Sequence, residues 1–304
     1  MLKNEKGKKP QVVGMIGLGY MGSAMSTNLL RDGCVVVGYD IVSEKVNNLR
    51  KKGGKILSSS QEVAKEAQMV ITSLPSSSAF EDVIWGKQGI LASCHEGLIV
   101  IECSTLPINE KQKAKKALEE AGMILLDCPI SGGTRAVEKD LVVYGSGDRS
   151  AFDKCVPIFN GFARSNYYLG EFGNGSKMKF VTNLLVAIHN TAAAEAFLLG
   201  MKSGLNPEMI YNVVKDSAGR SRMFEVRGPK MVKAEYDNPT MKVGIFKKDL
   251  EVISNFAAAL NCPTPLFSDC VQLYWAALAQ GREDQDTSSV CAVLEEMARF
   301  KRQE

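Results

Sequence analysis

The feature that most constrains the fold is a glycine-rich turn between a short apolar run and an amphipathic segment. Gly17, Gly19 and Gly22 follow the run Val12–Ile16 and precede a helical pattern that continues to about Arg31. The first glycine permits a tight turn, the second permits close approach of a ligand to the backbone, and the third permits close packing of helix on strand. The spacing predicts a strand, a turn and a helix whose N-terminus can bind an anion.

Asp40 adds a second constraint because it ends the next apolar run. A carboxylate at this position accepts hydrogen bonds from ribose hydroxyls and repels a 2′-phosphate. No arginine stands among the residues directly after it, Ile41, Val42 and Ser43. The pattern therefore predicts a dinucleotide site that prefers NAD to NADP. The cofactor-binding residues predicted in this part of the chain are Gly17, Gly19, Tyr20, Met21, Gly22 and Asp40.

Short apolar runs alternate with helical patterns as far as about Leu169. The runs are Val12–Ile16, Cys34–Tyr39, Met69–Leu74, Leu98–Cys103, Met123–Leu126 and Leu141–Tyr144. Continuous apolar strands separated by helices indicate a mostly parallel sheet that is covered on both faces. We therefore expect an α/β Rossmann domain with a doubly wound sheet over residues 11–172.

The second half of the chain shows only helical patterns. A stretch rich in alanine and leucine predicts one long helix at about residues 175–204, and Asn206 followed by Pro207 marks the start of the next. Further helices are predicted at Phe246–Leu260, at Leu266–Gln280 and from Thr287 to the end. We expect an all-α C-terminal domain over residues 173–304, joined by the long helix, and a flexible tail over residues 1–10.

Composition argues against several classes of partner. The chain has 37 basic and 34 acidic residues, a net charge of +3 and no basic stripe, so we expect no nucleic-acid partner. No signal peptide is recognised, and no apolar run approaches the roughly 18 residues of a membrane span, so we expect a cytoplasmic protein without a membrane partner. The eight cysteines form no C-x-x-C pair and two histidines are too few for a zinc site, so reduced thiols and no metal are expected.

Two further motifs each allow two interpretations. Ser131, Gly132 and Gly133 follow the fifth predicted strand, either as a plain turn or as a loop whose hydroxyl and N–H groups bind an anion. Lys179 and Asn183 are four residues apart and therefore share one otherwise apolar helix face. A lysine on such a face either extends its amine to water or, once desolvated, has a lowered pKa suited to acid–base chemistry.

Together these motifs resemble the β-hydroxyacid dehydrogenase family, which includes 3-hydroxyisobutyrate dehydrogenase, tartronate and succinic semialdehyde reductases and L-threonate dehydrogenase. The resemblance extends from Val12 to about Glu295. It rests on the glycine turn, Leu74 with Pro75, Ser104 with Thr105 and Pro107, the Ser131–Gly133 loop, the pair Lys179 and Asn183, and Lys248 followed by Asp249 and Leu250.

The resemblance implies an NAD-dependent oxidoreductase that transfers a hydride between nicotinamide and a small 3-hydroxy carboxylic acid. Lys179 matches the family's catalytic lysine and Asn183 its substrate-orienting amide. Ser131, Gly132, Gly133 and Lys248 match residues at the substrate, while Leu74, Pro75, Thr105 and again Lys248 match residues along the cofactor. The family's helical domain usually dimerises, so we expect a homodimer or homotetramer.

One departure concerns the substrate loop. The family generally has glycine nine residues after the loop serine, where this chain has Asp140. A glycine there suggests a positive φ, which Asp tolerates better than most residues, so the resemblance does not fix the geometry of the loop after Gly133. Arg135, just past the loop, either contacts an additional acidic or hydroxyl group of the substrate or lies on the surface.

Within the family, residues 218–227 and Ile245–Leu250 look most like the L-threonate dehydrogenase branch, which favours a four-carbon sugar acid. A semialdehyde reductase and a 3-hydroxyisobutyrate dehydrogenase are the alternatives. Imine reductases share the scaffold but usually have another residue in place of Lys179, and decarboxylating dehydrogenases of the 6-phosphogluconate type are typically much longer. A non-catalytic dinucleotide-binding module would lose Lys179, Asn183 and Ser131, all of which are present.

Overall fold

The computed structural model describes residues 11–302, apart from the side chains of residues 133–135. The predicted tail, residues 1–10, lies outside the described part. The chain forms two compact units that divide within one long helix, after Lys179.

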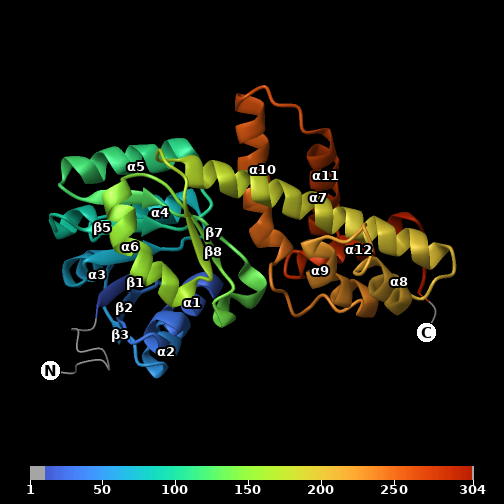
Figure 1. Ribbon diagram of the computed structural model, residues 1–304, viewed down its shortest axis with the longest axis horizontal. Coiled ribbons are helices and arrows are strands. Elements are labelled where there is room, and N and C mark those ends of the chain that lie inside the picture. The colour runs from blue at the N-terminus through green and yellow to red at the C-terminus, as the bar shows by residue number, and fades with distance from the viewer. Residues whose placement is uncertain (1–10, 303–304) are drawn as a thin grey trace. The chain divides into compact units, whose positions relative to one another are not determined.

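The first unit is built on a six-stranded parallel sheet (Figure 1). Its strands are β1 (Val12–Ile16), β2 (Val35–Tyr39), β3 (Lys55–Ile56), β4 (Met69–Thr72), β5 (Ile99–Glu102) and β6 (Ile124–Asp127). Their order is β3-β2-β1-β4-β5-β6, so the direction of winding reverses beside β1. Ile16 pairs with Tyr39 on one side and with Thr72 on the other, which brings three carboxyl ends to the same edge of the sheet. The predicted doubly wound Rossmann sheet is confirmed.

Helices cover both faces of this sheet, and each face has its own buried core. They are α1 (Tyr20–Arg31), α2 (Ser43–Lys51), α3 (Ser60–Glu66), α4 (Ser77–Trp85), η1 (Leu91–Ser93), α5 (Ile108–Glu120) and α6 (Arg149–Phe162). Met15, Met25 and Phe159 belong to one core. Val70 and Phe80 belong to the other. Side chains buried on both faces explain why the central strands are apolar throughout.

A second, three-stranded sheet follows the first. It contains β7 (Ile130–Ser131), β8 (Val142–Gly145) and β9 (Ser165–Tyr168), with η2 (Gly133–Glu138) after β7. β8 is antiparallel to β7 and parallel to β9. The prediction that Leu141–Tyr144 belongs to the parallel sheet is therefore wrong. An apolar run identifies a buried strand but does not say which strand is its neighbour.

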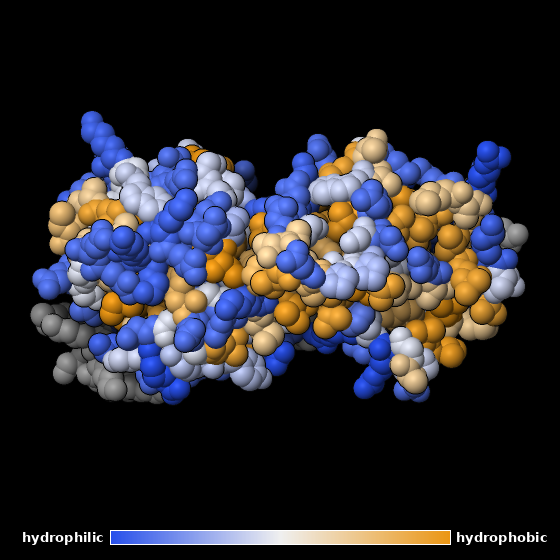
Figure 2. Space-filling view, turned by 90° about the horizontal axis from the view of Figure 1, so that it is seen from above, coloured by the Kyte–Doolittle hydropathy of each residue, from blue (hydrophilic) through white to orange (hydrophobic). Residues whose placement is uncertain are grey.

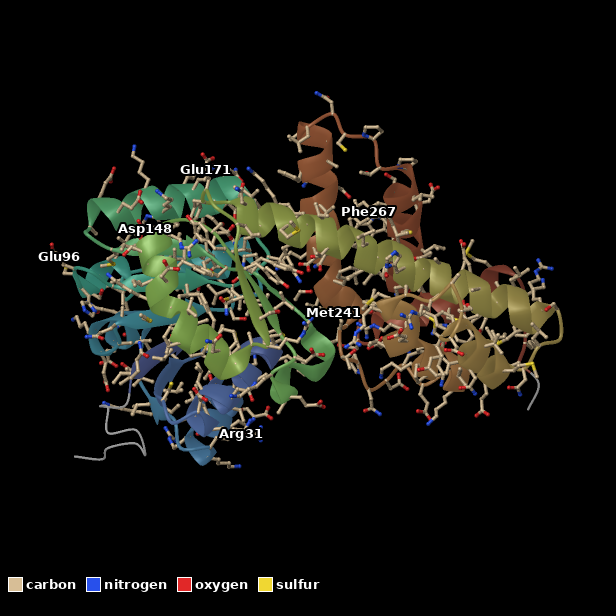
Figure 3. The ribbon with its side chains drawn as sticks, viewed as in Figure 1. Arg31, Glu96, Asp148, Glu171, Met241 and Phe267 are labelled. Atoms are coloured by element: carbon tan, nitrogen blue, oxygen red, sulfur yellow. The ribbon has the colours of Figure 1, made fainter. Side chains whose placement is uncertain are left out.

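The second unit, as far as the chain is described, is helical. Its elements are α7 (Asn174–Lys202), which begins in the first unit, α8 (Pro207–Val214), α9 (Arg222–Lys233), α10 (Val243–Ala259), α11 (Pro265–Ala279), η3 (Thr287–Ser289) and α12 (Val290–Met297). Asn206 caps α8 by accepting hydrogen bonds from the N–H groups of Glu208 and Met209, as its sequence predicts. Apolar side chains are also prominent on the surface of this unit (Figure 2). Phe267 of α11, labelled in Figure 3, is buried in its core.

Helix α7 bears on the expectation that the chain has no membrane-spanning segment. With 29 residues, it is long and apolar enough to cross a membrane by length and composition alone. It is not an unbroken apolar run, because Lys179, Asn183 and Asn190 interrupt it. In its most apolar stretch, 44% of the residues are buried inside the protein. The core helix of a soluble protein can have the same length and composition.

Candidate active site

Two glycines of the turn after β1 are required by the protein itself. Gly17 has φ +88°, and a Cβ there would lie 2.2 Å from the carbonyl oxygen of Ser73. A Cβ on Gly22, in the first turn of α1, would lie 1.9 Å from the carbonyl oxygen of Gly17. No side chain fits at either distance, so these two residues allow the tight turn and the close packing of helix on strand.

Gly19 differs from both, because nothing in the described protein lies within 4 Å of a Cβ built on it. Its φ of −62° is accessible to any residue. Neither strain nor packing explains a glycine here, but a ligand that approaches the backbone does. Tyr20 and Met21 follow in the first turn of α1, where N–H groups and the helix dipole favour a phosphate.

The Asp40 carboxylate lies at the same edge of the sheet and is held by two backbone groups. The N–H of Leu18, inside the glycine turn, donates to Oδ2 at 2.7 Å, and the N–H of Val42 donates to Oδ1 at 2.8 Å. Lys45 is 4.0 Å from Oδ2. The next residue, Ile41, is 87% exposed and offers an apolar surface beside the carboxylate. This arrangement suits the ribose and base of an adenine nucleotide.

Leu74, Pro75 and Thr105 follow the carboxyl ends of β4 and β5, which are neighbours in the sheet. The N–H of Leu74 donates to the hydroxyl of Ser104 at 2.8 Å, which ties these two loops together. Ligands of doubly wound sheets bind outside the carboxyl ends of the strands, where the winding reverses. The glycine turn, Asp40 and these loops therefore fit a dinucleotide, whose pyrophosphate would lie at the N-terminus of α1.

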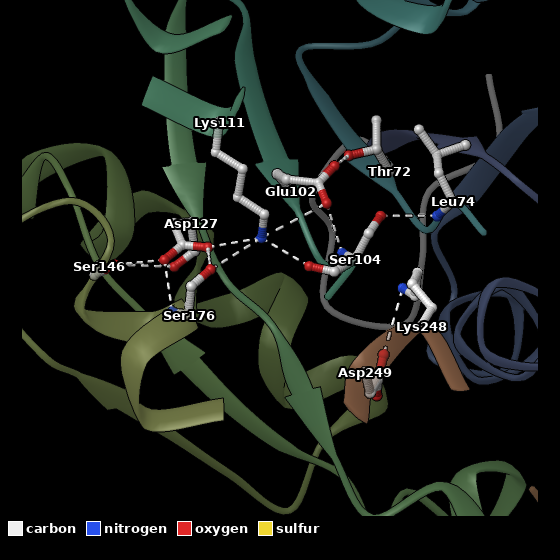
Figure 4. Close-up of polar contacts among 10 residues, drawn as sticks. All are labelled: Thr72, Leu74, Glu102, Ser104, Lys111, Asp127, Ser146, Ser176, Lys248 and Asp249. Carbon is white, nitrogen blue, oxygen red and sulfur yellow. Dashed lines mark hydrogen bonds and ion pairs between the residues drawn. The ribbon is translucent and has the colours of Figure 1, made fainter. Parts of the chain in front are cut away.

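A buried ionic group, which we call the Lys111 cluster, consists of Lys111, Glu102, Asp127, Ser104 and Ser176 (Figure 4). The Lys111 amine is 2.9 Å from Asp127 Oδ1 and 3.8 Å from Glu102 Oε1. It also donates to the Ser104 carbonyl oxygen at 2.7 Å and to the Ser176 hydroxyl at 3.2 Å. All three charged side chains are fully buried. The cluster links the ends of β5 and β6 to α5 and to the first turn of α7.

The two carboxylates determine the charge state of this lysine. Burial alone lowers the pKa of Lys111, but Asp127 and Glu102 outweigh burial and raise that pKa above its ordinary value. The remaining carboxylate oxygens have hydrogen-bond donors as well. The Thr72 hydroxyl donates to Glu102 Oε2, and the N–H of Ser176 donates to Asp127 Oδ2 at 2.7 Å. The charges are therefore paired and hydrogen-bonded, as buried charges must be.

Sequence reasoning missed the Lys111 cluster. Lys111 lies among other lysines of α5, a pattern typical of a solvated helix face. The available signal was its spacing, because Lys111, Ala114 and Leu118 share the buried face of the helix. Glu102 and Asp127 gave another signal, since each is a charged residue at the end of a buried strand. Neither signal identifies the partner of the lysine.

The loop predicted to bind the substrate lies at the start of the second sheet. Ser131 ends β7 and is partly exposed, Gly132 is exposed with φ +106°, and Gly133 begins η2. A Cβ on Gly132 would lie 2.3 Å from the carbonyl oxygen of Asp140, so this glycine is required by the loop's own packing. Any role in binding a substrate is additional to that.

Asp140 does not have a positive φ, whereas the preceding residue, Lys139, has one at +60°. Asp140 instead forms an ion pair with Arg164 at 2.8 Å. The residue with positive φ therefore stands one position before the one at which the family generally has glycine. The side chain of Arg135 lies outside the described part.

On α7, Lys179 and Asn183 are separated by one helical turn and share a face, as predicted. In the second unit the buried Asn183 amide donates to Asp249 Oδ2 at 2.8 Å. The amine of Lys248 lies 3.5 Å from the other oxygen of the same carboxylate. The structure thus brings Asn183 and Lys248 together through Asp249, while Lys179 ends the first unit and the glycine turn, Asp40 and Ser131 belong to that unit.

Both halves of the chain match known family models. Residues 12–170 match the NAD-binding domain of 6-phosphogluconate dehydrogenase. Residues 173–294 match the model described as the NAD-binding domain of NADP-dependent 3-hydroxyisobutyrate dehydrogenase. The two matches cover most of the described chain and agree with the division seen in its secondary structure.

Similar proteins match over nearly the whole chain. An L-threonate dehydrogenase of Cupriavidus necator is 34% identical over 93% of this chain and 95% of its own length. An NAD-dependent L-serine dehydrogenase of Pseudomonas aeruginosa is 32% identical over 91% of this chain and 96% of its own. A crystal structure of 3-hydroxyisobutyrate dehydrogenase from Salmonella typhimurium superposes with a TM-score of 0.85 at 30% identity, covering 93% of this chain and 99% of that one. The chain therefore belongs to the β-hydroxyacid dehydrogenase family of NAD(P)-dependent oxidoreductases, as its motifs predicted.

Proposed function

We propose that this enzyme uses NAD to oxidise a small 3-hydroxy carboxylic acid with Lys179 as the general acid–base group, and that its substrate is a four-carbon sugar acid such as L-threonate. The observation that carries the assignment of roles is the hydrogen bond from Asn183 to Asp249, because it fixes an amide one helical turn from Lys179. The L-threonate dehydrogenase of C. necator supports the choice of substrate. Semialdehyde reduction and 3-hydroxyisobutyrate oxidation are the alternatives, since they use the same groups.

All the residues assigned to the cofactor except Lys248 belong to the first unit. Gly17, Gly19 and Gly22 with Tyr20 and Met21 hold the pyrophosphate, and Asp40 holds the adenosine ribose. Leu74, Pro75, Thr105 and Lys248 line the rest of the dinucleotide. When bound, NAD supplies the hydride acceptor in oxidation and NADH the hydride donor in reduction. Preference for NAD follows from Asp40, because its carboxylate repels a phosphate on the 2′-oxygen.

The reaction also needs groups that move a proton and hold the acid. In oxidation a neutral Lys179 removes the hydroxyl proton as hydride leaves the carbon that bears this hydroxyl. In reduction the charged form of Lys179 returns that proton to the carbonyl oxygen. Asn183, held by Asp249, orients the hydroxyl-bearing carbon. Ser131, Gly132 and Gly133 bind the carboxylate with a hydroxyl and N–H groups. Lys248 stands beside Asp249 and adds positive charge for the acid.

Replacement of Lys179 tests this assignment. Lys179→Ala should lower kcat by about a hundredfold or more, the usual scale for a general acid–base group, while the Kd for NADH stays within about twofold of the parent. Both values are measured on the same preparation, by nicotinamide absorbance and by fluorescence titration. Parental turnover in the variant contradicts the assignment, and loss of NADH binding makes Lys179 a cofactor residue instead.

We further propose that residues 11–172 are the cofactor domain, that residues 173–304 form the substrate and dimerisation domain, and that the enzyme is a cytoplasmic homodimer or homotetramer. Exposed apolar side chains on the helical unit support assembly through that unit. They include Leu185, Leu199, Leu205, Met209, Val213, Ile245, Leu260 and Leu266. Light scattering measures the assembled mass, and a monomeric mass at micromolar concentration contradicts the proposal.

A further inference from the structure

We propose that the Lys111 cluster positions Lys179, by fixing the first turn of α7 to the ends of β5 and β6. This inference rests on the proposed role of Lys179. All residues of the Lys111 cluster, as well as Lys179, belong to the first unit of the chain. Lys111 and Ser176 are positioning residues in this account, since they act through Lys179.

The connection to Lys179 is short. Ser176 precedes Lys179 by three residues on α7, which is less than one helical turn and about 4.5 Å along the axis. The backbone N–H of Ser176 donates to Asp127 Oδ2 at 2.7 Å, and its hydroxyl donates to Oδ1 at 2.7 Å. Two hydrogen bonds from one residue to one carboxylate limit both sliding and rotation of this helical turn. The N–H of Gly175 adds a third bond, to the hydroxyl of Ser146 at 2.9 Å.

The same lysine also supports the loops assigned to the cofactor. Lys111 donates to the Ser104 carbonyl oxygen at 2.7 Å, and the Ser104 hydroxyl accepts the N–H of Leu74 at 2.8 Å. Glu102 accepts the N–H of Ser104 at 2.6 Å. One buried amine thus holds the first turn of α7 and the loops after β4 and β5 (Figure 4). An arrangement of this kind sets the position of an acid–base group on α7 relative to the cofactor loops.

Stability alone does not explain a group of three buried charges. Well-packed apolar side chains of similar volume are often as stabilising as a buried ion pair, because burial of the charges is costly. Hydrogen bonds have a defined direction that apolar contacts lack, so they restrict the position of a helix more narrowly. Catalysis depends on that precision, because a misplacement of about 1 Å can reduce a rate about a hundredfold.

The test is Ser176→Ala, which removes one hydroxyl and leaves all three charges in place. Ser288→Ala is the matched control. Ser288 is equally buried, donates its hydroxyl to Asp286 Oδ1 at 2.8 Å and its N–H to the same oxygen at 3.0 Å, and Asp286 is paired with the buried Arg227. Both variants remove one hydroxyl from a buried ionic group, so both should lose stability to a similar extent.

We expect Ser176→Ala to lower kcat at least tenfold with the Kd for NADH within twofold of the parent, and Ser288→Ala to keep kcat within twofold. Both are assayed at a temperature where denaturant unfolding shows each variant fully folded. Equal kcat values in the two variants overturn the proposal, because they reduce the role of Ser176 to stability.

A double-mutant cycle separates this inference from the function on which it rests. If Ser176 acts through Lys179, adding Ser176→Ala to Lys179→Ala leaves the residual rate unchanged. If Ser176→Ala lowers kcat of the Lys179→Ala variant by the same factor as it lowers kcat of the parent, Ser176 does not act through Lys179. The positioning proposal then fails. If Lys179→Ala alone retains parental turnover, the proposed function fails first and the positioning proposal with it.

Discussion

The glycine turn yields a sharp prediction, because its glycines are required for different reasons. A Cβ on Gly22 would meet the Gly17 carbonyl oxygen at 1.9 Å, so Gly22→Ala must displace backbone. We expect Gly22→Ala to lower the free energy of unfolding by about 3 kcal/mol, the upper end of the usual range for overpacking. Gly19→Ala meets no atom of the described residues within 4 Å. Alanine is a poorer N-cap than glycine by about 0.5–1 kcal/mol. It also reduces the conformational entropy of the unfolded chain, which stabilises the folded protein by a comparable amount, about 0.4–1 kcal/mol.

Gly19→Ala should therefore change the free energy of unfolding by less than about 0.5 kcal/mol. Its methyl group would nevertheless occupy the space that a bound pyrophosphate needs. We expect the Kd for NADH to rise at least tenfold, which corresponds to about 1.4 kcal/mol. Urea unfolding without cofactor and fluorescence titration with NADH measure the two quantities. Parental NADH affinity in Gly19→Ala would refute the placement of the pyrophosphate, and parental stability in Gly22→Ala would refute the packing argument.

Two more predictions follow from single carboxylates. Asp40→Ala should weaken NAD and strengthen NADP, because it removes both the ribose acceptor and the charge that repels a 2′-phosphate; a higher kcat/KM with NADP in the parent enzyme would contradict this. Asp286 has a pKa that burial would raise, but Arg227 and the N–H groups of Ser288 and Thr240 lower it overall. It therefore contributes stability above its unfolded pKa, and that contribution is lost as pH falls through the lowered folded pKa. Asp286→Asn should lower the free energy of unfolding by about 3 kcal/mol at pH 7, because it leaves the Arg227 charge unpaired. It should also reduce the loss of this free energy at acid pH, as measured by urea unfolding. An unchanged pH dependence of unfolding would contradict the assignment.

Local sequence signals predicted much of the fold. The glycine turn, Asp40, the strands β1 and β2 and the start of α8 depend on neighbouring residues, and each is found where its pattern placed it. Strands β3 and β7 were missed because each has only two residues, and β9 was missed because its sequence, Ser165–Tyr168, is polar. Helix α9 was missed as well, since Gly228 and Pro229 interrupt its pattern.

Long-range partners account for what could not be predicted at the candidate site. Spacing on one helix identified Lys179 with Asn183, but the bond from Asn183 to Asp249 joins residues 66 positions apart. Lys111 and Asp127 come from different elements, and nothing in either segment names the other as a partner. The positive φ lies at Lys139, one residue before the family's usual glycine position, because it depends on how this turn is packed.

The central claim is that this enzyme acts on a hydroxy acid whose carboxylate is recognised. The most direct measurement is kcat/KM with NAD for the most active acid among threonate, erythronate, 3-hydroxyisobutyrate and glycerate, compared with the primary amide of that same acid. A hydrogen bond to a charged group contributes about 1.5–3 kcal/mol, so the acid should react at least about tenfold better than its amide. Equal values for acid and amide would show that no carboxylate is recognised, and would contradict the assignment of the enzyme to hydroxy-acid oxidation.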